Sequence, residues 1–204
     1  MFLLSPANLG GARAAWLLRR GSDLPLAQAL RAEGSAGAPL AEAFSFVSSL
    51  YFRGKAAYAR AFARPPAGGA AGLVITPAEG LLALDEPVTA ARLEAWARVP
   101  IGARNGDFTG PLTRDAEMLE RAFGATTRFV LLGSVATEKY VRPLARVLGD
   151  HLLFPPDFVG RGDMSRGALL LRAAREGREL PYDVVEGART SRARVERRLR
   201  STRA

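Results

Sequence analysis

The sequence predicts a single-domain α/β protein with a mostly parallel or mixed sheet and helices on both faces. Short apolar runs alternate with helical patterns along the whole chain, and four or five of these runs are candidates for buried strands. A chain of 204 residues can bury a sizeable core, and no repeat with a period of about 20–50 residues suggests a solenoid. The α/β domain is expected to span residues 1–187.

Two strands are expected in the N-terminal half. The run "MFLLS" at residues 1–5 is interrupted by Ser5-Pro6, and "LVIT" at residues 73–76 follows a turn-rich connector. Three helical patterns lie between them, and the longest carries aromatic residues on one stripe and is expected to divide at Gly54. These patterns cover residues 12–20, 24–33 and 40–64.

Three strands and four helices are expected in the C-terminal half. The run "RFVLLGS" is the clearest strand, and "HLLFP" and "YDVVE" are shorter candidates. These strands are expected at residues 128–134, 151–155 and 182–186. Pro111 is expected to begin a helix, because its fixed φ suits the first helical position. The four helices are expected near residues 89–98, 111–123, 135–147 and 163–177.

Composition narrows the classes of function. The chain has no cysteine, which excludes thiol catalysis, disulfides and cysteine-bound zinc. A single histidine, His151, argues against a serine–histidine triad and a multi-histidine metal site, so no metal site or cofactor is predicted. The apolar runs are far shorter than the ~20 residues of a membrane span, and the N-terminus lacks the basic start of a secretion signal. A cytoplasmic protein without membrane contact is therefore expected; no oligomeric state is predicted.

The positive charge gathers in an arginine-rich C-terminal tail, expected at residues 188–204. Seven arginines and one acid, Glu196, lie in residues 189–204, so this segment carries +6 of the net charge of +9. Such a tail can bind a polyanionic partner, and a solvated chain end explains it equally well.

The segment "GRGDMSRGALLLR" at residues 160–172 combines glycines, arginines and an acid ahead of an apolar helix. It is not a dinucleotide-binding fingerprint, because Ser165 stands where the third glycine is needed. Asp163 can cap the helix, and the first-turn amides with Arg161 and Arg166 would make an anion site. The alternative is a capped helix whose arginines pair with nearby acids.

Ligands of parallel sheets collect at the carboxyl ends of the strands. The segment "LLGSVATEKY" at residues 131–140 fits this rule, because Gly133-Ser134 follows a strand and precedes a helix. This geometry presents backbone amides and a hydroxyl to phosphate or ribose, with Lys139 further along the helix. A plain strand–helix turn is the alternative. The rule also selects the loops at residues 5–11, 76–80 and 155–163.

Two further stretches contain candidate groups. Residues 48–62 place aromatic side chains beside Arg53 and Lys55, which suits stacking on bases and pairing with phosphates. The alternative is an amphipathic helix with its aromatic residues in the core and its basic residues in water. Residues 75–86 place Glu79 near a strand end, where a carboxylate could act as a general base.

Several stretches, taken in order, carry a family resemblance. Ser5-Pro6-Ala7 resembles an opening "SPA", residues 75–82 resemble a strand followed by "GLL", and residues 133–140 resemble a strand followed by "S-x-x-Y". Residues 161–166 resemble "RG-x-MSR", which is the most specific match, and residues 50–59 resemble "lFrgrraYa". These are motifs of the YaaA family of bacterial proteins and of related domains.

The resemblance implies an α/β protein with a basic cleft that binds DNA and that limits oxidative DNA damage during peroxide stress. It brings no established catalytic activity. It covers scattered stretches between about residues 5 and 185. Asn8 stands where the family usually has lysine, so a role that depends on that lysine is not carried over to this chain.

The resulting hypothesis is a protein that binds nucleic acid or a nucleotide-like anion in an arginine-lined cleft. It requires the loops at residues 133–134 and 160–166 to border one cleft, with Glu79 between them. The alternatives are a nucleoside- or nucleotide-processing enzyme with N-glycosidic or transfer chemistry at Glu79, and a scaffold whose basic tail binds an acidic partner. The candidate binding residues are Ser5, Asn8, Arg53, Lys55, Gly133, Ser134, Lys139, Arg161, Gly162, Ser165 and Arg166.

Overall fold

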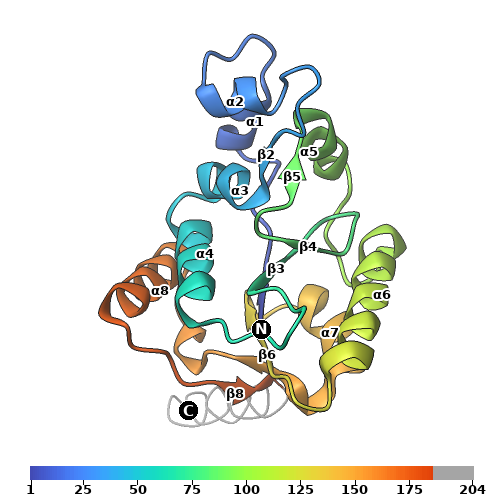
Figure 1. Ribbon diagram of the computed structural model, residues 1–204, viewed down its shortest axis with the longest axis vertical. Helices are drawn as coiled ribbons and strands as arrows, with labels where there is room; N and C mark the ends of the chain where they lie inside the picture. The colour runs from blue at the N-terminus through green and yellow to red at the C-terminus, as the bar shows by residue number, and fades with distance from the viewer. Residues whose placement is uncertain (186–204) are drawn as a thin grey trace, which may run out of the picture.

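A six-stranded mixed sheet forms the centre of the molecule (Figure 1). The computed structural model describes residues 1–185, and the tail expected at residues 188–204 lies outside the described residues. The strand order is β4-β3-β1-β6-β7-β8. The four central strands are parallel and the two edge strands are antiparallel, which confirms the expected α/β class. The strands are β1 (Phe2–Leu4), β3 (Gly72–Ile75), β4 (Leu81–Ala83), β6 (Phe129–Leu132), β7 (Leu152–Phe154) and β8 (Asp183–Val184).

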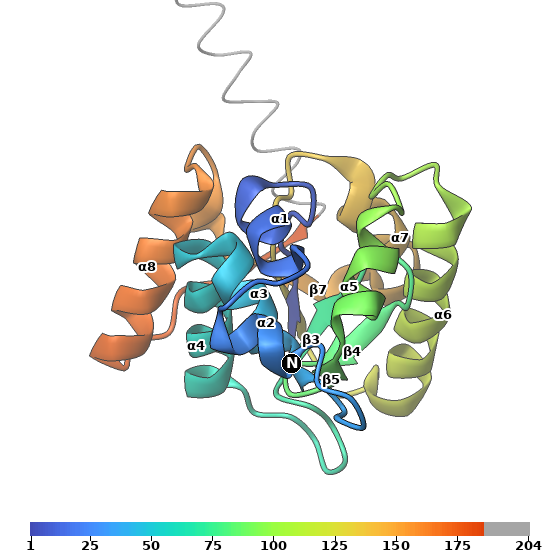
Figure 2. The same ribbon diagram turned by 90° about the horizontal axis from the view of Figure 1, so that it is seen from above.

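Helices cover both faces of this sheet, as the view from above in Figure 2 shows. One face packs against α4 (Leu50–Phe62) and α8 (Asp163–Glu176), and the other packs against α6 (Gly106–Phe123) and α7 (Glu138–Leu148). Within residues 1–185, no helix combines the length and the apolar character needed to cross a membrane.

The remaining elements gather near the carboxyl ends of the strands. They comprise short helices and a two-stranded antiparallel sheet formed by β2 (Ala38–Pro39) and β5 (Pro87–Val88). The helices are α1 (Ala12–Leu18), α2 (Pro25–Ala29), α3 (Leu40–Ser48) and α5 (Ala90–Ala97). A 3₁₀ turn at Pro156–Phe158 follows β7, whereas another at Gly149–His151 precedes β7, at the amino end of that strand.

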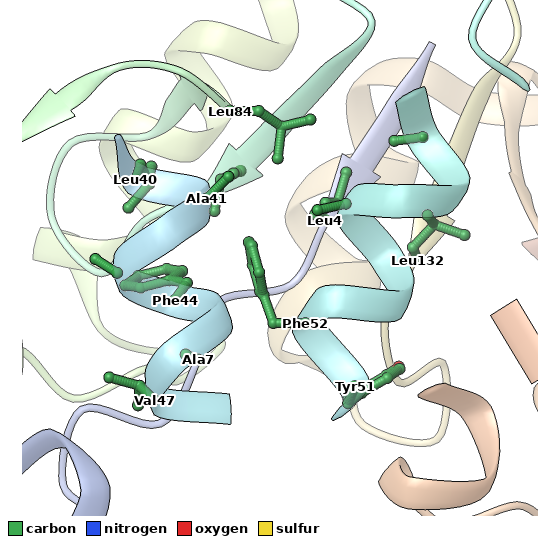
Figure 3. Close-up of a cluster of buried hydrophobic side chains, with 14 of the residues drawn as sticks. Leu4, Ala7, Leu40, Ala41, Phe44, Val47, Tyr51, Phe52, Leu84 and Leu132 are labelled. Atoms are coloured by element: carbon green, nitrogen blue, oxygen red, sulfur yellow. The ribbon is translucent and has the colours of Figure 1, made fainter. Parts of the chain in front are cut away.

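The core has two halves because side chains alternate across each strand. In β1, Phe2 and Leu4 point to the α4 side, and Leu3 points to the α6 side. All three side chains are buried, which explains why "MFLLS" is a continuous apolar run rather than an alternating one. Figure 3 shows how Phe44 of α3 and Phe52 of α4 extend this core toward the carboxyl ends, with ring centroids 5.3 Å apart.

The long helical pattern at residues 40–64 divides at Ser49, so the expected break at Gly54 is wrong. Ser49 has φ 51°, a conformation that ends α3 and starts α4 in a new direction. Gly54 lies inside α4, at the point where that helix meets α8. A Cβ atom at Gly54 would lie 2.6 Å from the carbonyl oxygen of Gly167, so this glycine permits close helix packing rather than a break.

Other helix boundaries also differ from the expected ones. The helix expected at residues 24–33 is the short α2, Pro25–Ala29, and the helix expected at residues 12–20 ends at Leu18. The helix expected to begin at Pro111 begins at Gly106, because the side chain of Asn105 caps it by accepting a hydrogen bond from the Asp107 amide at 3.2 Å. Pro111 therefore lies inside α6. The helix expected from residue 135 begins at Glu138, which leaves a longer loop after β6.

We predict that Gly54→Ala destabilises the protein by about 1–3 kcal/mol, because the new methyl group would collide with the backbone of α8. Alanine is the better helix former, so propensity alone predicts the opposite sign. Urea unfolding followed by circular dichroism measures the change.

The matched control is Gly106→Ala, at a helical glycine around which a Cβ atom would meet nothing within 4 Å. It is expected to leave stability unchanged or to raise it by about 0.4–1 kcal/mol. Equal effects of the two substitutions would contradict the proposed role of Gly54.

Candidate functional site

A pocket of about 550 Å³ opens where the parallel strands β1, β3 and β6 end, and we call it the carboxyl-edge pocket. The loop after β1 forms its floor, and the starts of α7 and α8 and the end of α5 form its walls. The pocket therefore lies at the edge of the sheet where the sequence-based rule expects ligands to bind. The lining residues are Ser5, Pro6, Ala7, Asn8, Leu9, Gly10, Ser48, Tyr51, Pro77, Trp96, Ala97, Val99, Pro100, Ile101, Ser134, Lys139, Tyr140 and Asp163.

Ser5 lies at the floor of this pocket, directly after β1. Its amide donates to the carbonyl oxygen of Leu132 at 3.2 Å, and its hydroxyl donates to the same oxygen at 3.3 Å. Gly133 packs against it, since a Cβ atom there would lie 3.0 Å from the Ser5 Cβ and 3.3 Å from its Oγ. Ser5 is 5% exposed. The neighbouring strand ends thus hold this hydroxyl in one place.

Lys55 lies directly behind Ser5 and has no exposed surface. Its Nζ donates to the Ser5 carbonyl oxygen at 2.5 Å and to the Ser5 Oγ at 2.9 Å. The same nitrogen lies 4.3 Å from the ring centre of Tyr51 and 4.9 Å from that of Phe52, one turn earlier in α4. No carboxylate among the described residues forms an ion pair with Lys55.

Burial lowers the pKa of Lys55 to about 7, because the charged ammonium loses its hydration. Asp163 opposes this shift and Arg166 adds to it. The unfolded chain holds this proton up to the usual lysine pKa, near 10.5, so the native state binds fewer protons between the two values. The free energy of unfolding contributed by Lys55 therefore rises with pH from about 7 to 10.5 and is lowest below 7.

The polar wall of the pocket comes from the loop after β6 and from α7. Ser134 and Lys139 both line the pocket, and Lys139 is the only basic side chain of residues 1–185 that does so. The Lys139 Nζ lies 5.0 Å from the ring centre of Tyr140, which is itself buried. Burial raises the pKa of Tyr140 and keeps its hydroxyl protonated. Asn8 completes this side, with its Oδ1 accepting from the Gly10 amide at 3.0 Å.

The opposite wall is apolar. It contains Pro77 after β3 and a run of residues from the end of α5, including Trp96, Val99 and Ile101. Trp96 is 2% exposed, and its Nε1 donates to Glu79 Oε1 at 2.7 Å. One side of the pocket can therefore make polar contacts while the other offers an apolar surface.

The segment at residues 160–166 contributes Asp163 to the pocket but neither of its arginines. Arg161 donates to the Asp157 carbonyl oxygen at 2.9 Å and to Ser165 Oγ at 3.2 Å. Arg166 donates to the Phe158 carbonyl oxygen at 3.1 Å and pairs with Asp163 at 3.5 Å. These contacts hold the turn before α8.

The helix cap in this segment also differs from the expected one. Gly162 is the N-cap residue of α8, and Asp163 is the first helical residue and makes no capping hydrogen bond. Its side chain is 72% exposed. Since Asp163 and Ser134 both line the pocket, the loops at residues 133–134 and 160–166 do border one cavity.

The basic residues of α4 have separate surroundings. Arg53 is exposed and borders a shallow hollow with Arg13 and Phe46, away from the carboxyl-edge pocket. Lys55 is buried, so the amphipathic alternative, which places the basic residues of this helix in water, is wrong for Lys55.

Glu79 does not line the pocket. Its carboxylate accepts from Arg92 Nε at 2.9 and 3.0 Å, and the Arg92 guanidinium also donates to Glu86 at 3.1 Å. Hydrogen bonds from Arg92 hold the pKa of Glu79 below its usual value. The Thr76 hydroxyl accepts from the Glu79 amide at 3.0 Å and fixes the turn. Glu79 thus fixes the indole of Trp96 through a hydrogen bond, and Trp96 lines the pocket whereas Glu79 does not.

Sequence reasoning missed the apolar wall and the part that Tyr51 plays. The sequence predicts Tyr51 on the buried stripe of a helix, and it is 6% exposed, yet it also lines the pocket together with Ser5. Trp96 and Ile101 carry no motif. Their only signal is position, since Trp96 lies at the end of α5 and Ile101 lies in the loop at residues 98–105 that follows it.

We predict that Lys55 titrates with a pKa of about 7 in the folded protein. The chain contains only two lysines, so protein labelled with [¹³Cε]lysine gives two side-chain NMR signals that can be followed from pH 5 to 11. Lys139→Arg assigns the signals by removing one of them. A folded protein in which neither signal has a midpoint below about 9 would contradict this account of Lys55.

We predict that Glu79→Gln lowers the free energy of unfolding by about 1–2 kcal/mol, because it removes the charge from a carboxylate that is hydrogen-bonded to Arg92 and Trp96. The lowered pKa of Glu79 means that its charge stabilises the fold at neutral pH. The difference from wild type should shrink below a pH of about 4.

The matched control is Glu94→Gln, which removes a looser ion pair to Arg31 at 3.4 Å and should cost about 0.5 kcal/mol or less. Chemical unfolding of both variants at pH 7 and pH 3.5 makes the comparison. A Glu79→Gln variant as stable as wild type at pH 7 would contradict the supporting role.

Comparison with models of protein families, with curated proteins and with solved structures finds no match. The resemblance to the YaaA family therefore stays a prediction that its motifs alone carry.

Proposed function

We propose that this protein binds a nucleotide unit in the carboxyl-edge pocket, either as a free nucleotide or as part of a nucleic acid strand. The observation that carries the proposal is the division of one cavity into a polar wall with a single lysine and an apolar wall beside a tryptophan. A nucleotide has the same division, since its phosphate is anionic and its base is flat and largely apolar on its faces.

The polar wall offers the contacts that a phosphorylated sugar requires. Lys139 supplies a positive charge, and Ser134 on the preceding loop supplies a hydroxyl. Asp163 and Asn8, which also line the pocket, carry oxygens that can accept hydrogen bonds from sugar hydroxyls. The pocket therefore offers a charge for the phosphate and acceptors for the sugar.

The apolar wall and the size of the pocket suit a base. Val99 and Ile101, both half-buried, form an apolar surface against which a planar ring can pack, and the buried Trp96 lies beside them. The volume of about 550 Å³ lies within the range of about 300–1,000 Å³ that is usual for small-molecule sites. A duplex does not enter a cavity of this size, so in a nucleic acid the bound unit would be an unpaired nucleotide.

The arginines assigned to the cleft by the sequence take no part in this proposal. Arg161 and Arg166 are hydrogen-bonded within the turn before α8 and line no part of the pocket. The contribution of the tail at residues 188–204 and the link to peroxide stress stay predictions of the sequence. The enzyme hypothesis based on Glu79 is not adopted, because that carboxylate is paired with Arg92 outside the pocket.

Tryptophan fluorescence tests the proposal directly. The chain contains two tryptophans, so Trp16→Phe, at a side chain that is 50% exposed, leaves Trp96 as the only reporter. We predict that mononucleotides change the Trp96 emission, and that Lys139→Ala raises their dissociation constant about tenfold or more through loss of a charge-assisted contact. Binding of the corresponding nucleosides should change little in the same variant.

The matched control is Arg142→Ala, an exposed cation on α7 that does not line the pocket and should leave binding unchanged. Mononucleotides, single-stranded oligonucleotides and duplex DNA are compared at two salt concentrations, since affinity for a strand falls more steeply with salt. A protein whose Trp96 emission responds to none of these ligands does not have the proposed function.

A further inference from the structure

We propose that Ser5 and Lys55 form a nucleophile–base pair, and that the pocket hydrolyses an ester or another activated acyl compound. This inference goes beyond the binding of a nucleotide and does not depend on the identity of the rest of the ligand. It rests on three features: a hydroxyl in the floor of a pocket, an amine directly behind it, and the absence of solvent around that amine.

The positions of the two side chains fit this chemistry. Lys55 Nζ lies 2.9 Å from Ser5 Oγ, within the range of about 2.6–3.2 Å that joins a nucleophile to its base. Ser5 lines the pocket and Lys55 does not, so a ligand meets the hydroxyl first. When Lys55 is neutral, one N–H can stay with the Ser5 carbonyl oxygen, and the Ser5 hydroxyl must turn its proton from the Leu132 carbonyl oxygen to the lone pair of Nζ.

The surroundings of Lys55 make it available as a base. A surface lysine is protonated at neutral pH and cannot accept a proton, whereas burial lowers the pKa of Lys55 to about 7. The charged and titratable groups that face it are Asp163 and Arg166 of α8 and the ring of Tyr51. Asp163 favours the ammonium form and Arg166 disfavours it, so burial decides the direction.

The reaction can be written so that every proton is accounted for. Neutral Lys55 removes the proton from Ser5 Oγ while Oγ bonds to the acyl carbon of the substrate, which gives a tetrahedral intermediate and an ammonium. The bond from that carbon to its leaving group then breaks, and Lys55 returns the proton to the leaving group. Water attacks the acyl–Ser5 ester in the same way, with Lys55 as base, and releases the carboxylic acid.

Gly133 supports this arrangement. Its missing side chain leaves room for Ser5, since a Cβ atom there would press against both Cβ and Oγ of the serine. The contact between Nζ and Oγ places the two groups within reach of proton transfer, and a lysine that only fastened Ser5 to α4 could make the same contact. The labelling of Ser5 and its pH dependence separate a reactive pair from a structural one.

Covalent labelling of the folded full chain with a fluorophosphonate tests the proposal. Attack by Ser5 on phosphorus would release fluoride and leave a stable adduct, which peptide mapping by mass spectrometry can locate. We expect modification at Ser5, with a rate that rises about tenfold between pH 6 and pH 8 as a base with a pKa of about 7 loses its proton. Thermally unfolded protein should not react.

Three variants make the experiment decisive. Ser5→Ala should abolish labelling, whereas Ser48→Ala, which removes another serine hydroxyl from the pocket lining, should leave it intact. Lys55→Met should abolish labelling of Ser5; because this variant can also lose stability, the pH profile of the wild-type protein serves as the independent measure of the base. Modification elsewhere than at Ser5, no modification, or a rate independent of pH between 6 and 8 would overturn the proposal.

Nucleotide binding is measured separately through Trp96, so failure of the labelling does not affect the proposed function. Conversely, labelling at Ser5 in a protein that binds no nucleotide would leave the nucleophile–base pair in place and remove only the assignment of the ligand.

Discussion

The contact between Lys55 and the end of β1 is the interaction on which the rest of the site depends. A lysine with no exposed surface is costly to keep charged, and the protein offsets that cost with two oxygens of Ser5 and two aromatic rings rather than with a carboxylate. This choice leaves the amine easy to deprotonate. The hydrogen bonds from Lys55 to Ser5 also fix α4 against the carboxyl end of β1. Without them the ammonium group would lie unpaired in an apolar core.

Close backbone packing makes that position possible. The amine reaches Ser5 because α4 lies near the sheet. Helix α8 packs closely against α4 at Gly54 and Gly167. A Cβ atom added at either glycine would lie within 3 Å of the backbone of the other helix. The same contact brings the start of α8, and with it Asp163, to the rim of the pocket. The close packing at Gly54 and Gly167 thus helps to place Asp163 near the buried amine of Lys55.

The α/β class, the main strands and the edge that carries the pocket could be predicted from the sequence, because periodicity and strand-sized apolar runs are local signals. The break at Ser49 could not, since no glycine or proline marks it and tertiary packing imposes its positive φ. The same limit applies to Lys55, whose burial depends on residues about fifty positions away. Arg161 and Arg166 belong to the strongest motif, yet both are hydrogen-bonded to the turn before α8. A motif shows which residue types are present but not where their side chains point, so the sequence could not predict this.

The break at Ser49 also connects two parts of the molecule. Helix α3 belongs to the group of short elements near the carboxyl ends, whereas α4 belongs to the layer that covers the main sheet (Figure 1). Ser48 and Tyr51, on either side of the break, both line the pocket. A change in the angle between these helices would therefore widen or narrow the cavity without disturbing the sheet. A single residue of unusual backbone conformation thus helps to set the position of the α3 helix relative to the pocket.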